Sequence, residues 1–212
     1  MEIKAIETEY NGYRFRSRLE ARWAVFFDSL GVKYEYEPEG YELPSGKKYL
    51  PDFKVKCYGK RGMRDSEPFD LFIEVKGEMT KEDEERIVEF AGAEKEEITD
   101  DFVSTWFEVR NPVLIVSQLP NVGDYDYNDM SHCEIAFNYW LIDGDWFGAY
   151  PAAHDGHFYL FGANSNYINT DDIPQILQAY DNARKARFEH GEKPKVNKKQ
   201  IVFEDCCNLR FF

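Results

Sequence analysis

Long hydrophobic runs are missing from this sequence, and no stretch approaches the ~20 apolar residues that a helix needs to span a bilayer. The first residues, MEIKAIETEY, also lack the basic start and apolar stretch of a secretory signal. Cysteine is scarce, and neither the isolated Cys57 and Cys133 nor the adjacent Cys206 and Cys207 form a CxxC pair or a zinc-type set. We therefore expect a cytoplasmic protein with free thiols and no membrane partner.

Basic residues are outnumbered, because 26 Lys and Arg stand against 40 Asp and Glu, for a net charge of −14. Spread evenly, that charge would repel the phosphate backbone of nucleic acid. It is uneven, however: residues 10–66 carry 12 basic and 8 acidic side chains, a balance of +4. Residues 184–199 carry 7 and 2, a balance of +5, whereas 67–101 and 102–183 are each at −10. The sequence therefore permits a basic face on an acidic protein.

Residues 15–31 are predicted to form a helix. Four large apolar side chains recur there at helical spacing, namely Leu19, Trp23, Phe26 and Leu30. An S-x-x-E capping box precedes this stripe, and a glycine follows it where the helix should stop. The start, the apolar face and the end of the pattern therefore agree.

Strands and a second helix are predicted beyond this point from alternating or apolar runs bounded by turn residues. The strands cover 32–43, 48–58, 69–77 and 111–120, and the helix covers 80–92. A Pro-Ser-Gly turn joins the first two strands into a hairpin. The order helix, three strands, helix, strand predicts an α/β protein whose mixed sheet is flanked by helices.

The second half of the chain is less regular. Aromatic-rich strands are predicted at 134–142 and 157–162, with a loop rich in glycine and aspartate between them at 143–156. A last helix is predicted at 172–191, where apolar residues recur at helical spacing and the C-terminal end becomes basic. No internal repeat or linker separates this half from the first.

Two carboxylates and a lysine fall on neighbouring predicted strands. Asp52 lies on the returning strand of the hairpin, whereas Glu74 and Lys76 lie on the next strand, where alternate side chains share one face. Two carboxylates in one pocket repel each other unless a cation joins them, and hard oxygen ligands suit Mg²⁺ or Mn²⁺. The carbonyl of Val75 would add a further ligand. An exposed cross-strand ion pair is the alternative, which the apolar neighbours disfavour.

The segments YRFRSRLEARWAVFFDSLGVKYEYEP, YLPDFKV and LFIEVKG resemble the core of the PD-(D/E)XK nuclease superfamily, in particular small nuclease-like proteins of bacteriophages and prophages. The resemblance covers about residues 13–120. It implies a restriction-endonuclease-like core of αβββαβ order, metal binding by Asp52 and Glu74, and a catalytic Lys76. It also implies that Glu20 completes the metal site, although a capping-box role is physically sufficient for this residue.

The function implied by this resemblance is hydrolysis of DNA phosphodiester bonds with Mg²⁺ or Mn²⁺. The setting would be an endonuclease of phage or mobile-element DNA metabolism in the host cytosol. We expect one structural domain, in which residues 1–120 form the nuclease-like core and residues 121–212 form an aromatic-rich C-terminal extension packed on it. The alternative is a catalytically silent protein of the same fold, whose acidic second half binds a host or phage protein.

Basic side chains near the predicted site are candidates for contacts with the DNA backbone. They are Arg14, Arg16, Arg18 and Arg22 around the first helix, Lys47 and Lys48 at the hairpin turn, and Arg184, Lys185 and Arg187 on the last helix. A solvated helix face would explain the first group equally well. Many members of the superfamily act as dimers, so a homodimer is left open.

Overall fold

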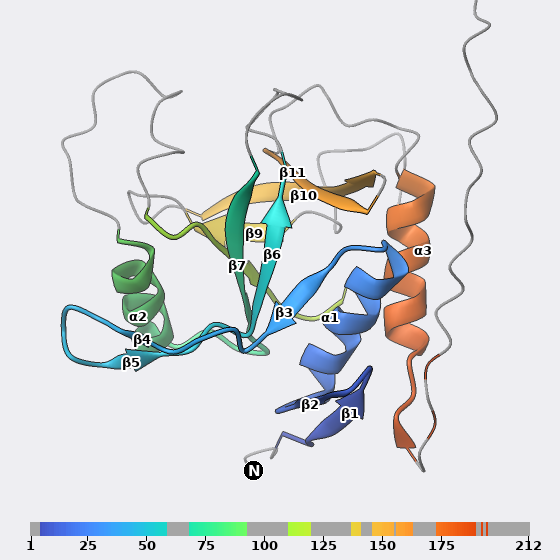
Figure 1. Cartoon of the computed structure of the whole chain (residues 1–212), viewed down its shortest axis with the longest axis horizontal. Coiled ribbons are helices and arrows are strands. Elements are labelled where there is room, and N and C mark those ends of the chain that lie inside the picture. Colours follow the sequence, from blue (N-terminus) through green and yellow to red (C-terminus); the bar gives the residue numbers. More distant parts are fainter. Residues whose placement is uncertain are drawn as a thin grey trace, which may run out of the picture.

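A computed structural model describes residues 5–58, 68–92, 110–119, 137–140, 146–154, 156–162, 173–189, 192 and 194. Over these residues the protein is of the mixed α/β class, with three helices, one mixed sheet and two small hairpins (Figure 1). The helices are α1 (Arg18–Ser29), α2 (Lys81–Ala91) and α3 (Ile173–Lys185). None of the described helices is long and apolar enough to cross a membrane.

The main sheet has the strand order β11–β10–β9–β8–β7–β6–β3. Its strands are β3 (Tyr34–Tyr36), β6 (Phe53–Cys57), β7 (Phe69–Val75), β8 (Val113–Val116), β9 (Phe137–Trp140), β10 (Trp146–His154) and β11 (His157–Gly162). β7 runs antiparallel to β6 and parallel to β8, so the sheet is mixed as predicted. β11 also pairs with β6, through Phe158 and Cys57, so the sheet curls back on itself.

The two hairpins lie outside the main sheet. One joins β4 (Tyr41–Glu42) to β5 (Lys48–Tyr49), and the other joins β1 (Thr8–Tyr10) to β2 (Tyr13–Phe15). The second hairpin was not predicted from the sequence. It turns through Asn11 and Gly12, both at positive φ, and this dipeptide is the strongest short-range hairpin signal.

Two apolar cores cover opposite faces of β7. On one face α1 packs against the sheet and against α3, where the rings of Phe26 and Tyr180 stack with centroids 4.6 Å apart. On the other face α2 and the β4–β5 hairpin enclose Phe72, whose ring lies 5.0 Å from that of Phe90. Figure 1 shows α1 and α3 side by side and α2 beyond the far side of the sheet. Because side chains alternate along β7, Glu74 falls on the α2 face together with Phe72.

Some boundaries differ from the sequence prediction. Residues 146–154 form β10, whereas a loop was predicted for 143–156. The glycines and aspartates of this segment are typical of a loop, but its central residues pair with β9 and β11. The strand predicted at 48–58 is divided into β5, which pairs with β4 in the separate hairpin, and β6 of the main sheet, and Leu50 to Asp52 between them are not in a strand. Asp52 therefore precedes β6 instead of lying within a strand. The division of the chain at residue 120 stays a prediction, although β9 pairs directly with β8.

Candidate functional site

Asp52 and Glu74 are brought together by the register of the sheet. Phe53 pairs with Ile73 across β6 and β7, so one step further along this antiparallel pair places Asp52 opposite Glu74. Both carboxylates are almost wholly buried, with exposed fractions of 3% and 4%. Burial of two acids at neighbouring positions costs free energy unless their charges are offset. Such a pair is therefore unusual among residues that serve only the fold.

Asp52 is held by two groups from different parts of the chain. Its Oδ2 accepts a hydrogen bond from the backbone N–H of Val75 at 2.7 Å, and its Oδ1 pairs with the guanidinium of Arg16. Burial, followed by the negative charge of Glu74, raises the pKa of this carboxyl to a net value of about 7. The Val75 N–H and the Arg16 charge act in the opposite direction. The balance of these effects disfavours the ionised form of Asp52 near neutral pH.

Glu74 is bound by a lysine and a tyrosine. Its Oε1 lies 2.9 Å from Nζ of Lys76, and its Oε2 accepts a hydrogen bond of 2.8 Å from the hydroxyl of Tyr49. Burial, followed by the charge of Glu74, raises the pKa of Tyr49 well above its usual value, so its hydroxyl stays a donor. Sequence reasoning missed Tyr49, which the β4–β5 hairpin carries over the site.

Lys76 connects the end of β7 to the start of α2. Its Nζ lies 3.1 Å from Oδ1 of Asp83, which also closes the capping box of α2 with Thr80. Burial lowers the pKa of Lys76, but the charge of Glu74 and the hydrogen bonds to Glu74 and Asp83 outweigh it and the net direction is upward. Lys76 is therefore a permanent ammonium group at neutral pH, about one quarter exposed.

Glu20 is buried at the start of α1 and is engaged by three donors. Its Oε1 accepts from the Ser17 hydroxyl at 2.7 Å, and its Oε2 accepts from the hydroxyl of Tyr36 at 2.7 Å and from the backbone N–H of Arg16 at 3.0 Å. Its charge also raises the pKa of Asp52, so the two carboxylates are electrostatic neighbours. Ser17 caps α1 by accepting from the backbone N–H of Glu20, but the Glu20 carboxylate accepts from the N–H of Arg16 instead of that of Ser17, so the expected capping box is only half formed. The role of Glu20 in a metal site stays a prediction.

These side chains line one cavity of about 420 Å³. Its wall combines three buried carboxylates with four cationic side chains: Glu20, Asp52 and Glu74 with Arg16, Lys48, Lys76 and Arg86. All four residues predicted to be catalytic, together with Val75, therefore border the same space. Of the residues that sequence reasoning did not select, Tyr49, Asp83 and Arg86 also lie on this wall.

The predicted DNA-binding residues are only partly gathered here. Arg16 and Lys48 border the cavity, whereas Arg14 lies on β2 and is paired with Glu7. Lys47 is an exposed residue of the β4–β5 turn. The other two candidates, Arg18 and Arg22, lie on α1, where Arg18 pairs with Glu189.

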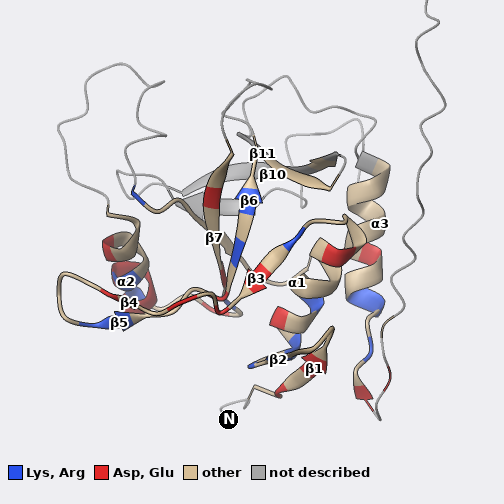
Figure 2. Cartoon of the chain, in the orientation of Figure 1, with Lys and Arg blue, Asp and Glu red and all other residues tan. Residues whose placement is uncertain are grey.

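The basic residues at the end of α3 are also engaged. Arg184 donates to the carbonyl of Leu119, Lys185 pairs with Asp181, and Arg187 pairs with Glu192. Figure 2 shows basic residues on β2, at the start of α1 and at the lower end of α3, and acidic residues gathered on α2.

The donor set of the cavity fits a small hard cation held by two protein carboxylates. Asp52 and Glu74 supply oxygen ligands, and in a regular strand the carbonyl of Val75 points to the same side as its N–H, which faces Asp52. Over the described residues, no three acidic, histidine or cysteine side chains converge closely enough to form a protein-only cage. Mg²⁺ commonly binds through one or two carboxylates, retains several waters and takes phosphate oxygens from the substrate, so the fit holds.

Comparison of the chain with protein-family models, with curated proteins and with solved structures gives no match in any of the three. The resemblance to the PD-(D/E)XK superfamily therefore stays a prediction. It rests on the sequence motifs, and the placement of Asp52, Glu74 and Lys76 around one cavity is compatible with it.

Proposed function

We propose that this protein is a metal-dependent deoxyribonuclease of the PD-(D/E)XK type. The observation that carries the proposal is the pairing of two buried carboxylates, Asp52 and Glu74, with the ammonium of Lys76 on the wall of one cavity. Structural ion pairs seldom place two acids in register at buried positions, because the second acid raises the cost of ionising the first. A site that handles a cation and a phosphate explains why both are there.

Asp52, Glu74 and the carbonyl of Val75 would hold the ion. When bound, Mg²⁺ or Mn²⁺ supplies Lewis acidity that promotes ionisation of water and offsets the charge developing on phosphate oxygens. The cation would also relieve the repulsion that raises the pKa of Asp52. The chain's contribution is the fixed separation of the two carboxylates, set by the register of β6 and β7.

Lys76 would act on the phosphodiester as a fixed positive charge. Because its pKa is raised, it donates hydrogen bonds and does not serve as a general base. Its contacts with Glu74 and Asp83 hold Nζ at the cavity wall, where it can orient an attacking water and stabilise the charged transition state. In the hydrolysis, the water oxygen bonds to phosphorus and one phosphorus–oxygen ester bond breaks. The attacking water loses a proton to solvent, and the leaving oxygen takes up a proton from solvent to become a hydroxyl.

The test is cleavage of a mixed panel of DNAs (duplex, junction, flap and single strand) with Mg²⁺ or Mn²⁺ and with chelator. The native protein is compared with Asp52→Asn and Lys76→Ala. The matched control is Lys54→Ala, because Lys54 is a lysine of similar exposure on β6 that pairs with Glu35 outside the cavity. We expect metal-dependent cleavage that falls at least ~100-fold in both site variants, a loss typical of essential charged groups.

Retained activity in Asp52→Asn and Lys76→Ala would refute the site, and equal loss in Lys54→Ala would point to a general structural effect. Endonuclease action, a role in phage or mobile-element DNA metabolism and dimer formation are parts of the proposal that rest on the sequence resemblance. The length of the cleavage products tests endonuclease action, and the mass of the protein with and without DNA tests dimer formation.

A second candidate function is a catalytically silent nuclease fold that binds a protein through its acidic surface. One observation favours it: each site carboxylate already has donors within the chain, with Arg16 on Asp52 and Lys76 and Tyr49 on Glu74. Much of the acidic half lies outside the described residues. Absence of cleavage and of Mn²⁺ binding, with both carboxylates intact, would favour this alternative.

A further inference from the structure

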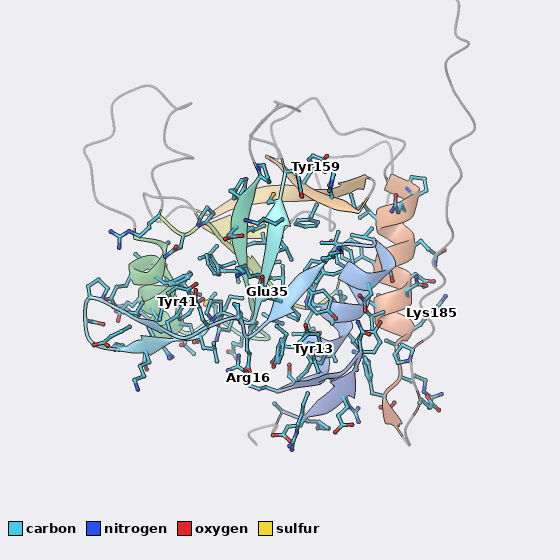
Figure 3. All side chains as sticks on the ribbon, in the orientation of Figure 1. Tyr13, Arg16, Glu35, Tyr41, Tyr159 and Lys185 are labelled. Atoms are coloured by element: carbon cyan, nitrogen blue, oxygen red, sulfur yellow. The ribbon has the colours of Figure 1, made fainter. Side chains whose placement is uncertain are left out.

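Arg16 occupies a defined position at the mouth of the candidate site. Its backbone N–H is shared between Glu20 Oε2 and the hydroxyl of Tyr36, each at 3.0 Å, which fixes the residue just ahead of α1. Its guanidinium then spans two acids, with Nη2 on Oδ1 of Asp52 and Nε 2.9 Å from Oε1 of Glu37. Figure 3 labels Arg16 between the β1–β2 hairpin and the strand ends that carry the site.

The burial of the two partners is unequal. Asp52 is 3% exposed, whereas the side chain of Arg16 is 53% exposed. Arg16 could therefore exchange Asp52 for another anion at the surface, whereas Asp52 would keep the hydrogen bond from the backbone N–H of Val75. A phosphate of DNA is such an anion, because a guanidinium binds its oxygens in bidentate fashion.

The Arg16 cation and a divalent cation would compete for Asp52. A guanidinium in contact with Oδ1 takes up part of the carboxylate's capacity to accept, and its positive charge repels an ion approaching from the cavity. Lys76 has no contact with Asp52, because its ammonium pairs with Glu74 and Asp83. The cost of admitting the ion at Asp52 thus depends on where Arg16 is.

We propose that Arg16 couples DNA binding to metal binding, pairing with Asp52 when DNA is absent and moving to a backbone phosphate when DNA is bound. The proposal rests on the proposed function of the site. It makes the coupling reciprocal, so that DNA tightens metal binding by the same factor by which metal tightens DNA binding. Breaking one charge-assisted contact corresponds to a change of about tenfold in affinity.

The experiment measures Mn²⁺ affinity calorimetrically for the full chain at pH 8, without DNA. Arg16→Gln is compared with the native protein and with Arg14→Gln, a matched variant of a neighbouring exposed arginine that pairs with Glu7. Asp52→Asn identifies the binding site, and thermal unfolding verifies that each variant is folded. We expect Arg16→Gln to bind Mn²⁺ about tenfold more tightly than the native protein and Arg14→Gln to be unchanged.

A second arm adds a short DNA duplex in a Lys76→Ala background, in which the DNA should stay intact. DNA should tighten Mn²⁺ binding about tenfold when Arg16 is present and hardly at all when Arg16→Gln is added. Arg16→Lys keeps the charge but cannot span Asp52 and Glu37 together, so its affinity without DNA should be intermediate.

The two hypotheses fail in different ways. Equal or weaker Mn²⁺ binding by Arg16→Gln, with binding still abolished in Asp52→Asn, would overturn the coupling and leave the metal site standing. Absence of Mn²⁺ binding in the native protein and in every arginine variant would overturn both. Tighter binding in Arg14→Gln as well would also refute the proposal, because it would indicate a general effect of net charge.

Discussion

Replacement of Asp52 by asparagine should stabilise the fold while abolishing the proposed metal-dependent DNA cleavage. The asparagine keeps the size of the side chain and removes a charge that the folded protein accommodates poorly. Folding raises the pKa of Asp52 from its ordinary value of 3.8 to about 7 through burial and the charge of Glu74. At 1.36 kcal/mol for each pKa unit, this shift lowers the free energy of unfolding of the native protein by at most about 4 kcal/mol.

The sign of the pH dependence follows from which state releases its proton first. Below about pH 4, Asp52 is protonated in both states and costs nothing. Between about pH 4 and pH 7 the unfolded chain ionises while the native carboxyl retains its proton, so the free energy of unfolding falls as pH rises. Above about pH 7 both states are ionised and the full cost is present. The gain from Asp52→Asn should therefore grow up to pH 7 and then level off.

The assay is thermal unfolding of the native protein and of Asp52→Asn at pH 5.5, 7 and 8.5, with and without Mg²⁺. A gain of about 2–4 kcal/mol at pH 8.5 corresponds to a rise in Tm of roughly 5–10 °C for a chain of this length. Mg²⁺ should raise the Tm of the native protein and leave that of the variant unchanged. A variant less stable than the native protein at pH 8.5, or a difference independent of pH, would refute the reasoning.

Three further predictions concern neighbouring residues. Tyr49→Phe removes a buried donor to Glu74 and should lower the free energy of unfolding by about 1–3 kcal/mol in urea denaturation; no change would indicate that water replaces the hydroxyl. Glu20→Gln should destabilise α1 by about 1–2 kcal/mol and weaken Mn²⁺ binding; an unchanged Mn²⁺ affinity would limit Glu20 to its hydrogen bonds at the start of α1. Phe26→Ala, which removes the ring stacked on Tyr180, should cost about 3–5 kcal/mol; a smaller loss would mean that α3 repacks or contributes little to the core.

Local signals in the sequence were sufficient for the helices and for part of the site. Ser17 and Thr80 cap the first two helices, and Gly31 and Gly92 adopt positive φ where those helices end, so start and stop residues carried the information. The placement of Asp52 near Glu74 was also predictable, because they belong to consecutive predicted strands whose register is restricted by the pattern of buried side chains.

The remaining contacts of the site have no local signal. Arg16 and Asp52 are 36 residues apart, and Tyr49 and Glu74 are 25 apart, so each pairing depends on how separate elements pack. Nothing in the spacing of these residues distinguishes them from solvated charges or from core aromatics. β10 was missed for a different reason: its alternation is interrupted by glycine and small residues, and only pairing with β9 and β11 makes it a strand.

The double role of Asp83 has a consequence for the timing of local motion. One carboxylate closes the first turn of α2 and also pairs with the ammonium of Lys76, so fraying of this helix end leaves the lysine with Glu74 alone. Opening of the first turn, which hydrogen exchange measures at its backbone amides, should then be accompanied by faster chemical labelling of Lys76. The stability of a helix terminus thereby contributes to how firmly the lysine is held.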